Sequence, residues 1–261
     1  MFPPRSTAPR PAPKAKLKPA EGLARFVAGA TTALAKLGFA TDARAKSTWT
    51  RSLPNGVVHQ ISLNLGTREP RPNVAVGDPE LMTLLSRATG MDEPLPTMGL
   101  EYLYFRGLVP GQPWNERGRA SFNYEICHAE CVDKSVVTFA REVARFAVPL
   151  FEQLGTLASL DDFFHRTKPY GPARKNWEMD REAASGPAGH FWRADRGLLL
   201  VTAVAAVARP KARKATFTDA RQRAKQWQRR HIYGASKSLL AELDTLEATL
   251  GPAPRARLKL T

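Results

Sequence analysis

The sequence predicts an α+β fold: a mainly antiparallel four- to five-stranded sheet with two helices on one face, followed by a helical C-terminal region. Three observations lead to this fold class. Asn55-Gly56 lies between two strand-like runs, and such a step is typical of a hairpin turn. Residues 120–154 change from a period of two to a helical period. Beyond residue 190 the apolar spacing is helical throughout.

The N-terminal part predicts a helix, a hairpin and a second helix. Apolar residues at helical spacing over 21–37 predict a helix that ends at Gly38. We expect strands over 47–53 and 57–65, with a further short strand at 74–76. Asp78-Pro79-Glu80 predicts the next helix start, because aspartate suits the cap and proline the first helical position.

The central part predicts two more strands, over 100–108 and 119–128, and then a long helix. In the second strand Phe122, Tyr124 and Ile126 alternate with polar residues, which indicates a half-buried strand. From Asp133, the expected N-cap, a helix should run to residue 154. Pro149 should kink it near Arg145. A short helix is expected to begin at Ser159 with a capping box.

Composition divides the chain into five segments: a basic, proline-rich and disordered tail at 1–20, an α+β domain at 21–166, a linker or loop at 167–190, a helical region at 191–250 and a basic tail at 251–261. In the helical region, residues 191–208 should form a buried helix. Over 218–231, Ala220, Ala224 and Trp227 share one face. Four leucines at heptad-like spacing need a partner helix in this chain or another: Leu239, Leu243, Leu246 and Leu250.

Residues 21–166 resemble the bacterial domain of unknown function 4304 family. The matching residues are Gly38-Phe39, Gln60, Pro149-Leu150 and Ser159-Leu160-Asp161. The resemblance implies the order helix, hairpin, strand pair and long helix. The family has no established activity, so the resemblance implies no catalytic residue.

The positive charge is concentrated in a few segments. The formal net charge is +15. The two tails and residues 209–230 hold this excess, and the rest of the chain is nearly neutral. Such segregation favours a polyanion partner such as nucleic acid, although basic segments can also serve solubility alone. The predicted nucleic-acid-binding residues are Arg221, Arg223, Lys225, Arg229 and Arg230 on a solvated helix face, with Trp114, Arg117 and Arg119 in a loop.

No motif of nucleophilic catalysis or phosphate binding occurs, so we predict no catalytic residue and no cofactor. Cys127, His128 and Cys131 are the best metal candidates. In a strand, however, Cys127 and His128 would point to opposite faces, and there is no second cysteine pair. We therefore expect no structural zinc. Glu101, Glu125 and Asp78 are not expected to assemble a nuclease-like cluster.

Two functional hypotheses follow. The first is a non-enzymatic intracellular binding protein for nucleic acid or another polyanion. The alternative is a protein-interaction module of the immunity or antitoxin type, which would use the four leucines for a partner or for self-association. An enzyme is the third choice. The N-terminus lacks the apolar region of a secretory signal, and the longest apolar run, 197–208, is shorter than the roughly 20 residues that span a bilayer. We therefore expect a cytoplasmic protein without membrane contact.

Overall fold

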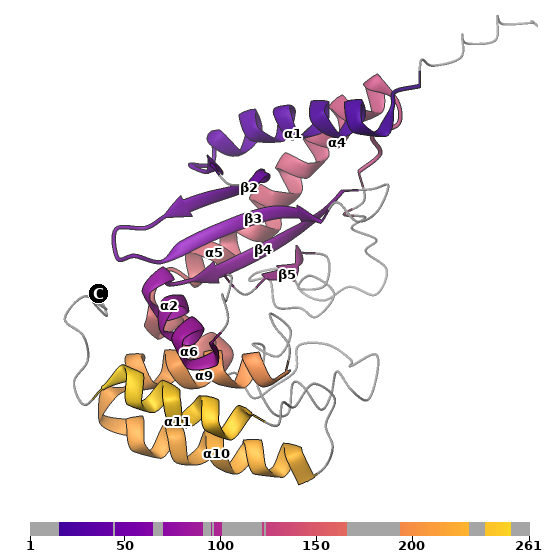
Figure 1. Ribbon diagram of the computed structural model, residues 1–261. Coiled ribbons are helices and arrows are strands. Elements are labelled where there is room, and N and C mark those ends of the chain that lie inside the picture. Colours follow the sequence, from indigo (N-terminus) through magenta and orange to yellow (C-terminus); the bar gives the residue numbers. More distant parts are fainter. Residues whose placement is uncertain are drawn as a thin grey trace, which may run out of the picture.

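The computed structural model describes residues 16–43, 45–64, 70–90, 95, 97–100, 122, 124–165, 194–229 and 238–251. Within these residues the fold is α+β, as the sequence predicts (Figure 1). Five antiparallel strands form one sheet in chain order, and helices cover one face of it and continue beyond its last strand. No described helix is long and apolar enough to cross a membrane.

The sheet is a meander of β1 (Ala40–Asp42), β2 (Ala45–Ser52), β3 (Val58–Asn64), β4 (Arg71–Gly77) and β5 (Thr97–Gly99). The predicted hairpin is confirmed: Ser52 pairs with Val58 around the turn, where Gly56 has a φ of 93°. The Asn55 side chain accepts a hydrogen bond from the Val57 amide and donates one to the Gly155 carbonyl at 2.7 Å. The turn is therefore tied to the helical layer.

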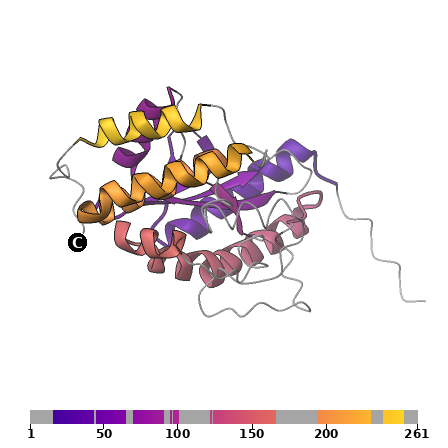
Figure 2. The same ribbon diagram turned by 90° about the horizontal axis from the view of Figure 1, so that it is seen from below.

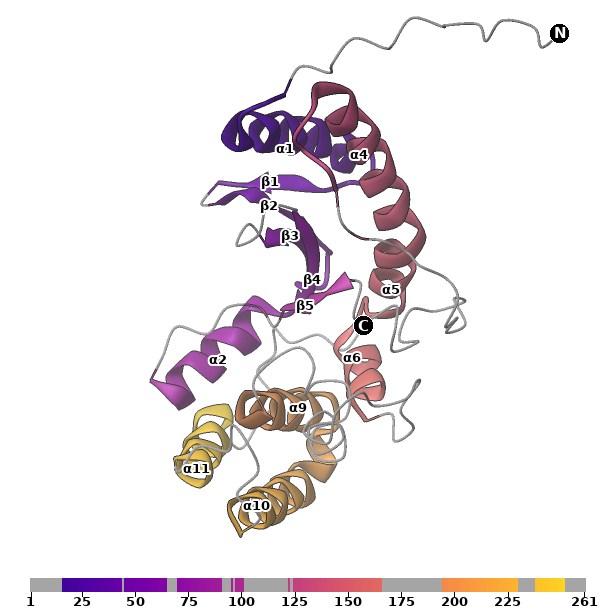
Figure 3. The same cartoon turned by 90° about the vertical axis from the view of Figure 1, so that its right-hand side faces the viewer.

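Two helices pack on one face of the sheet, as predicted (Figure 3). They are α1 (Pro19–Ala35) and α4 (Ala129–Glu142), which also contact each other. Gly22 permits a close approach of the chain to α1, because a Cβ there would lie 2.0 Å from the Ile126 carbonyl oxygen. The Asp133 carboxylate binds Arg25 of α1, with Nη2 2.7 Å from Oδ2.

Two expectations about this region are wrong. Helix α4 begins four residues before Asp133, with His128 as its N-cap residue. Residues 122 and 124–128 are not in the sheet, although Phe122, Tyr124 and Ile126 are buried as their alternation predicts. The reason is that carbonyls of this segment accept elsewhere: Glu125 from the Ser135 hydroxyl, and Cys127 from the Leu17 amide at 2.8 Å.

The predicted kink in the long helix is a π-helical segment, Val143–Ala147, that leads into α5 (Val148–Gln153). Pro149 has no amide hydrogen, so the Arg145 carbonyl cannot receive its usual α-helical bond. Helix α6 (Leu157–Phe164) follows. Thr156 caps it and forms a reciprocal capping box with Ser159, so the predicted box from Ser159 is wrong: the box lies three residues earlier and Ser159 is its third helical residue.

The C-terminal layer consists of α9 (Ala194–Ala208), the 3-10 turn η2 (Pro210–Ala212), α10 (Arg213–Arg229) and α11 (Leu239–Leu250). Helix α2 (Pro79–Thr89), capped by Asp78 as predicted, packs on α11. Figure 2 shows α10 and α11 lying side by side. The apolar residues of this layer and of the sheet region form one continuous core.

The four leucines of α11 are not a free interaction face. Leu239, Leu243, Leu246 and Leu250 are all buried, because α2, α9 and α10 of the same chain surround the helix. Self-association through these residues is therefore wrong. The first tail also ends earlier than predicted, since Lys16 pairs with His128 and α1 begins at Pro19. Residues 101–108 of the expected strand over 100–108, and the segment 167–190, lie outside the described residues.

Candidate nucleic-acid interface

Helix α10 carries the basic segment and is seated on the protein by one apolar face. Phe217, Ala220, Ala224 and Trp227 recur at helical spacing, and all four are buried. This arrangement confirms the predicted inward face around Trp227. The basic residues consequently lie toward the sides and the outside of the helix, where their neighbours decide which charges are accessible.

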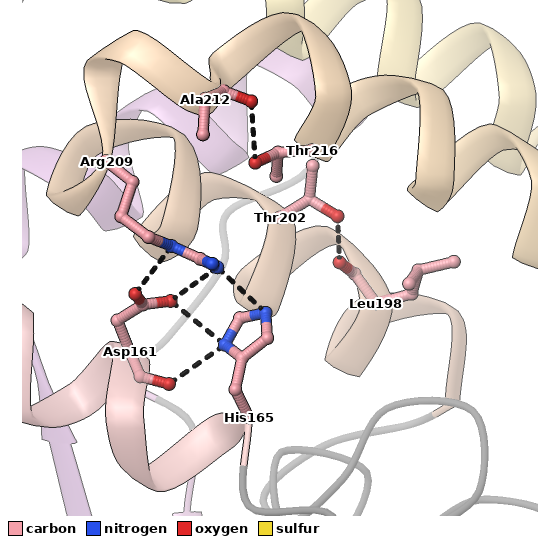
Figure 4. Close-up of polar contacts among 7 residues, drawn as sticks. All are labelled: Asp161, His165, Leu198, Thr202, Arg209, Ala212 and Thr216. Carbon is pink, nitrogen blue, oxygen red and sulfur yellow. Dashed lines mark hydrogen bonds and ion pairs between the residues drawn. The ribbon is translucent and has the colours of Figure 1, made fainter.

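The corner before α10 is held by Arg209 (Figure 4). Its Nε lies 2.8 Å from Oδ2 of Asp161 in α6, and its Nη2 lies 3.1 Å from both Oδ1 of Asp161 and Nε2 of His165. Because a guanidinium can only donate, Nε2 of His165 is an acceptor and the ring proton lies on Nδ1, 2.9 Å from Asp161. Arg209 is thus engaged within the fold.

The middle of α10 is joined to α11 by Arg221. Its Nε donates to Asp244 at 2.8 Å, and its Nη2 donates to Glu247. The Glu247 carboxylate, and to a smaller extent Asp244, raises the pKa of Arg221 above its usual value. The prediction that Arg221 lies mainly in water is therefore wrong: the side chain is 30% exposed and its charge is neutralised locally.

Two further cations of the segment have partners. Nε of Arg223 lies 2.8 Å from Oδ2 of Asp219, one helical turn earlier. Arg213 donates to the Gly251 carbonyl, which links the start of α10 to the end of α11. The sequence analysis does not predict the contribution of α11, because Asp244 and Glu247 are 23 and 26 residues from Arg221. The two acidic residues are three positions apart and each follows a leucine of the buried face, and this spacing is the signal that could have indicated their role.

Among the described residues of the basic segment, four exposed cations remain, which we call the α10 stripe: Lys211 in η2, and Lys214, Lys225 and Arg229 in α10. At about 100° per residue, Lys214, Lys225 and Arg229 fall within about 60° of one another around the helix. Two of the predicted binding residues, Lys225 and Arg229, belong to this stripe. The others in the prediction, Arg230, Trp114, Arg117 and Arg119, lie outside the described residues.

A second polar group is the imidazole of His59 in β3, whose neighbours are side chains of the fold itself. His59 is buried, stacks on Phe151 at 4.7 Å and accepts a 3.1 Å hydrogen bond at Nδ1 from Arg51. Burial, and then the Arg51 charge, lower the pKa of His59 to about 4. The Leu154 carbonyl opposes this shift weakly, without a well-formed hydrogen bond to Nε2. The ring is therefore neutral near pH 7.

The acidic residues considered for a nuclease-like cluster do not suggest one. Asp78 uses Oδ1 to cap α2, accepting from Glu80 and Leu81 at 2.7 and 3.1 Å, and burial raises its pKa. Glu125 lies before α4, and Glu101 is outside the described residues. Among the described residues, the arrangement suited to a polyanion is therefore the α10 stripe, whose cations can contact phosphates.

Comparison of the chain with protein-family models gave no match, and comparisons with curated proteins and with solved structures gave no significant similarity. The resemblance to the domain of unknown function 4304 family thus stays a prediction based on the residues quoted for it.

Proposed function

We propose that this chain is a non-enzymatic binding protein for nucleic acid and that the α10 stripe contacts the phosphate backbone. The observation that supports this proposal is that Lys214, Lys225 and Arg229 lie on one side of α10, away from its buried face, with Lys211 exposed in the turn before it. A helix fixed at its start by Arg209 and at its middle by Arg221 presents these charges without a large ordering cost. In this proposal the protein acts in the cytoplasm.

The proposal predicts a specific salt dependence. Four neutralised phosphates on duplex DNA correspond to a slope of log K against log salt of about −3 to −4. Phosphate contacts carry no direct sequence information, so binding should be nearly independent of sequence. The internal pairs of Arg221 and Arg223 lower the expected slope relative to a segment in which every cation is accessible.

The experiment compares two variants of equal charge. One replaces the stripe by glutamine: Lys211→Gln, Lys214→Gln, Lys225→Gln and Arg229→Gln. The matched control replaces four exposed cations around α1, β2 and α4, at the other end of the molecule (Figure 3): Lys36→Gln, Lys46→Gln, Lys134→Gln and Arg141→Gln. Binding of duplex DNA and of RNA is titrated with salt for both variants and for the parent chain.

The stripe variant should lose most of the slope, whereas the control should retain most of it. Equal losses in both variants would mean that net charge alone drives association, which would contradict the proposal. A parent chain that fails to bind either nucleic acid at low salt would also contradict it. The protein-interaction hypothesis would then need a surface other than the buried leucine face of α11.

A further inference from the structure

Residues 125–131 bring together side chains of the types that commonly serve as metal ligands. The ligand atoms of Glu125, His128 and Cys131 all lie within 4.8 Å of one another. Cys127 is adjacent, since its thiol donates to Oε1 of Glu125 at 3.3 Å. Nδ1 of His128 lies 3.5 Å from the same oxygen. Three potential donors, one sulfur, one nitrogen and one carboxylate, therefore lie close together at the start of α4, and the Cys127 thiol contacts the carboxylate of this group.

The backbone holds this cluster in place. The Glu125 carbonyl accepts from the Ser135 hydroxyl at 2.9 Å, and the Cys127 carbonyl accepts from the Leu17 amide at 2.8 Å. The Cys131 amide donates to the His128 carbonyl at 3.0 Å as the helix begins. This first turn brings His128 and Cys131, three residues apart, to the same side. The donors are therefore positioned by the fold before any ion arrives.

The geometry removes the reason for expecting no metal here. That expectation assumed a strand, in which Cys127 and His128 point in opposite directions. Residues 124–127 do not form a strand, and both side chains instead approach Oε1 of Glu125.

We propose that Glu125, His128 and Cys131, with Cys127 as the fourth donor, form a binding site for a zinc-type divalent cation. Zinc accepts thiolate, imidazole and carboxylate ligands together, at about 2.0–2.3 Å. Tetrahedral bonds of this length separate ligand atoms by about 3.3–3.8 Å, so small rotations of the Glu125, His128 and Cys131 side chains suffice, and the Cys127 thiol would turn from Glu125 to the ion. Binding replaces the two thiol protons by the cation and releases them to water as two H⁺. Mixed sulfur and nitrogen donors favour zinc over magnesium or calcium.

Cobalt(II) tests the site, because it substitutes for zinc and reports sulfur ligation by a near-ultraviolet charge-transfer band. The chain has two cysteines, Cys127 and Cys131, so this band can only come from them. The reduced full-length chain is titrated with Co²⁺, and zinc is then added to displace it. The same titration is made with Cys127→Ser, Cys131→Ser, His128→Gln and Glu125→Gln. Glu152→Gln, which changes an exposed carboxylate on α5, is the matched control.

The expected result is saturation at one Co²⁺ per chain, with d–d bands of tetrahedral intensity and complete displacement by zinc. Each cysteine variant should lose about half of the charge-transfer intensity, and the glutamine variants at 125 and 128 should bind at least about tenfold more weakly. Absence of a charge-transfer band in the parent chain would overturn the proposal. Unchanged affinity in both His128→Gln and Glu125→Gln would overturn it too. Circular dichroism of each variant confirms that a lost signal is not lost folding.

Discussion

The sheet side of the molecule and the C-terminal helices are held together by different kinds of contact. On the sheet side, aromatic rings surround Phe139, whose centroid lies 5.5 Å from those of Phe26 and Tyr124 and 6.2 Å from that of Trp49. The C-terminal helices instead pack mainly aliphatic residues, with Phe217 and Trp227 as the aromatic residues of α10, and are joined at their edges by Arg209 and Arg221. We therefore expect the stability of the sheet side to depend on the close fit of its residues and on pH, and the stability of the C-terminal helices to depend on the salt concentration.

The largest expected effect tests the close fit on the sheet side. Gly22→Ala would place a Cβ 2.0 Å from the Ile126 carbonyl oxygen, which belongs to the backbone and cannot rotate away. We expect a loss of more than about 3 kcal/mol in the free energy of unfolding, measured by chemical denaturation.

Gly29→Ala in the same helix is the matched control. Its Cβ would lie 2.8 Å from Cγ2 of Val136, a side-chain atom that can move. The gain in helix propensity offsets part of the crowding, so the change should stay within about 1 kcal/mol. Equal losses for both variants would show that the contact of Gly22 with the Ile126 carbonyl does not require glycine as strictly as we infer.

The second prediction concerns the protonation of His59. Its pKa in the folded state is lowered to about 4 from 6.5. Between these values the unfolded chain takes up a proton that the folded chain does not, so stability falls as pH falls through this window. The contribution should be about 2 kcal/mol, because residual solvation reduces the full difference.

The measurement is the difference in unfolding free energy between the parent chain and His59→Phe from pH 7 to pH 4. The phenyl ring keeps an aromatic contact with Phe151 and does not titrate. The buried carboxyl of Glu142, whose pKa is raised by burial, titrates in the opposite sense in both proteins and cancels. A difference that stays constant with pH would contradict the prediction.

The third prediction compares the removal of Arg209 with the removal of its partner Asp161. Arg209→Gln leaves Asp161, whose side chain is 8% exposed, without its main counter-ion and should cost about 2 kcal/mol. Asp161→Asn leaves an arginine that is 46% exposed and can turn to water, so it should cost about 1 kcal/mol. Thermal unfolding at low salt checks the order. The reverse order would mean that water solvates the Asp161 carboxylate once Arg209 has been replaced.

The smallest expected effect tests the salt dependence of the helical layer. Arg221→Gln should cost about 1 kcal/mol at low ionic strength, since it breaks contacts with both Asp244 and Glu247. In 1 M salt the cost should shrink, because screening weakens a partly exposed pair. Arg223→Gln, which breaks the pair with Asp219 within α10, is the control and should cost about 0.3–0.5 kcal/mol. If the cost of Arg221→Gln did not change with salt, Arg221 would stabilise the fold by packing rather than by its ion pairs.

Local sequence signals predicted the parts of the fold that local chemistry determines. The Asn55-Gly56 turn, the Asp78 cap and the inward residues of α10 were all predicted, because each depends on neighbours within a few residues. The segment 122–128 shows the limit. Alternation predicted which side chains are buried, but strand formation also needs a partner strand. The Cys127 and Glu125 carbonyls instead accept hydrogen bonds from the Leu17 amide and the Ser135 hydroxyl.

The candidate sites show the same division. Helical spacing predicted that Lys225 and Arg229 face away from Trp227, whereas the neutralisation of Arg221 depends on a helix more than twenty residues later. The convergence of Cys127 and His128 on Glu125 was missed because a wrong strand assignment reversed the direction of one side chain. Charge and periodicity predict a face of an element, but not what other elements place against it.

The contact between α1 and α4 has a consequence for biosynthesis. Arg25 and Asp133 are 108 residues apart in the chain. Closing a loop of this length costs about 4 kcal/mol of chain entropy before any contact forms. At roughly 5–20 residues per second, a ribosome needs on the order of 5–20 s to add the residues between them. During that interval the β2–β4 meander can pair locally, but the apolar face of α1 has no second helix to cover it. Nascent chains of this protein should therefore be most exposed to chaperones and proteases before α4 emerges.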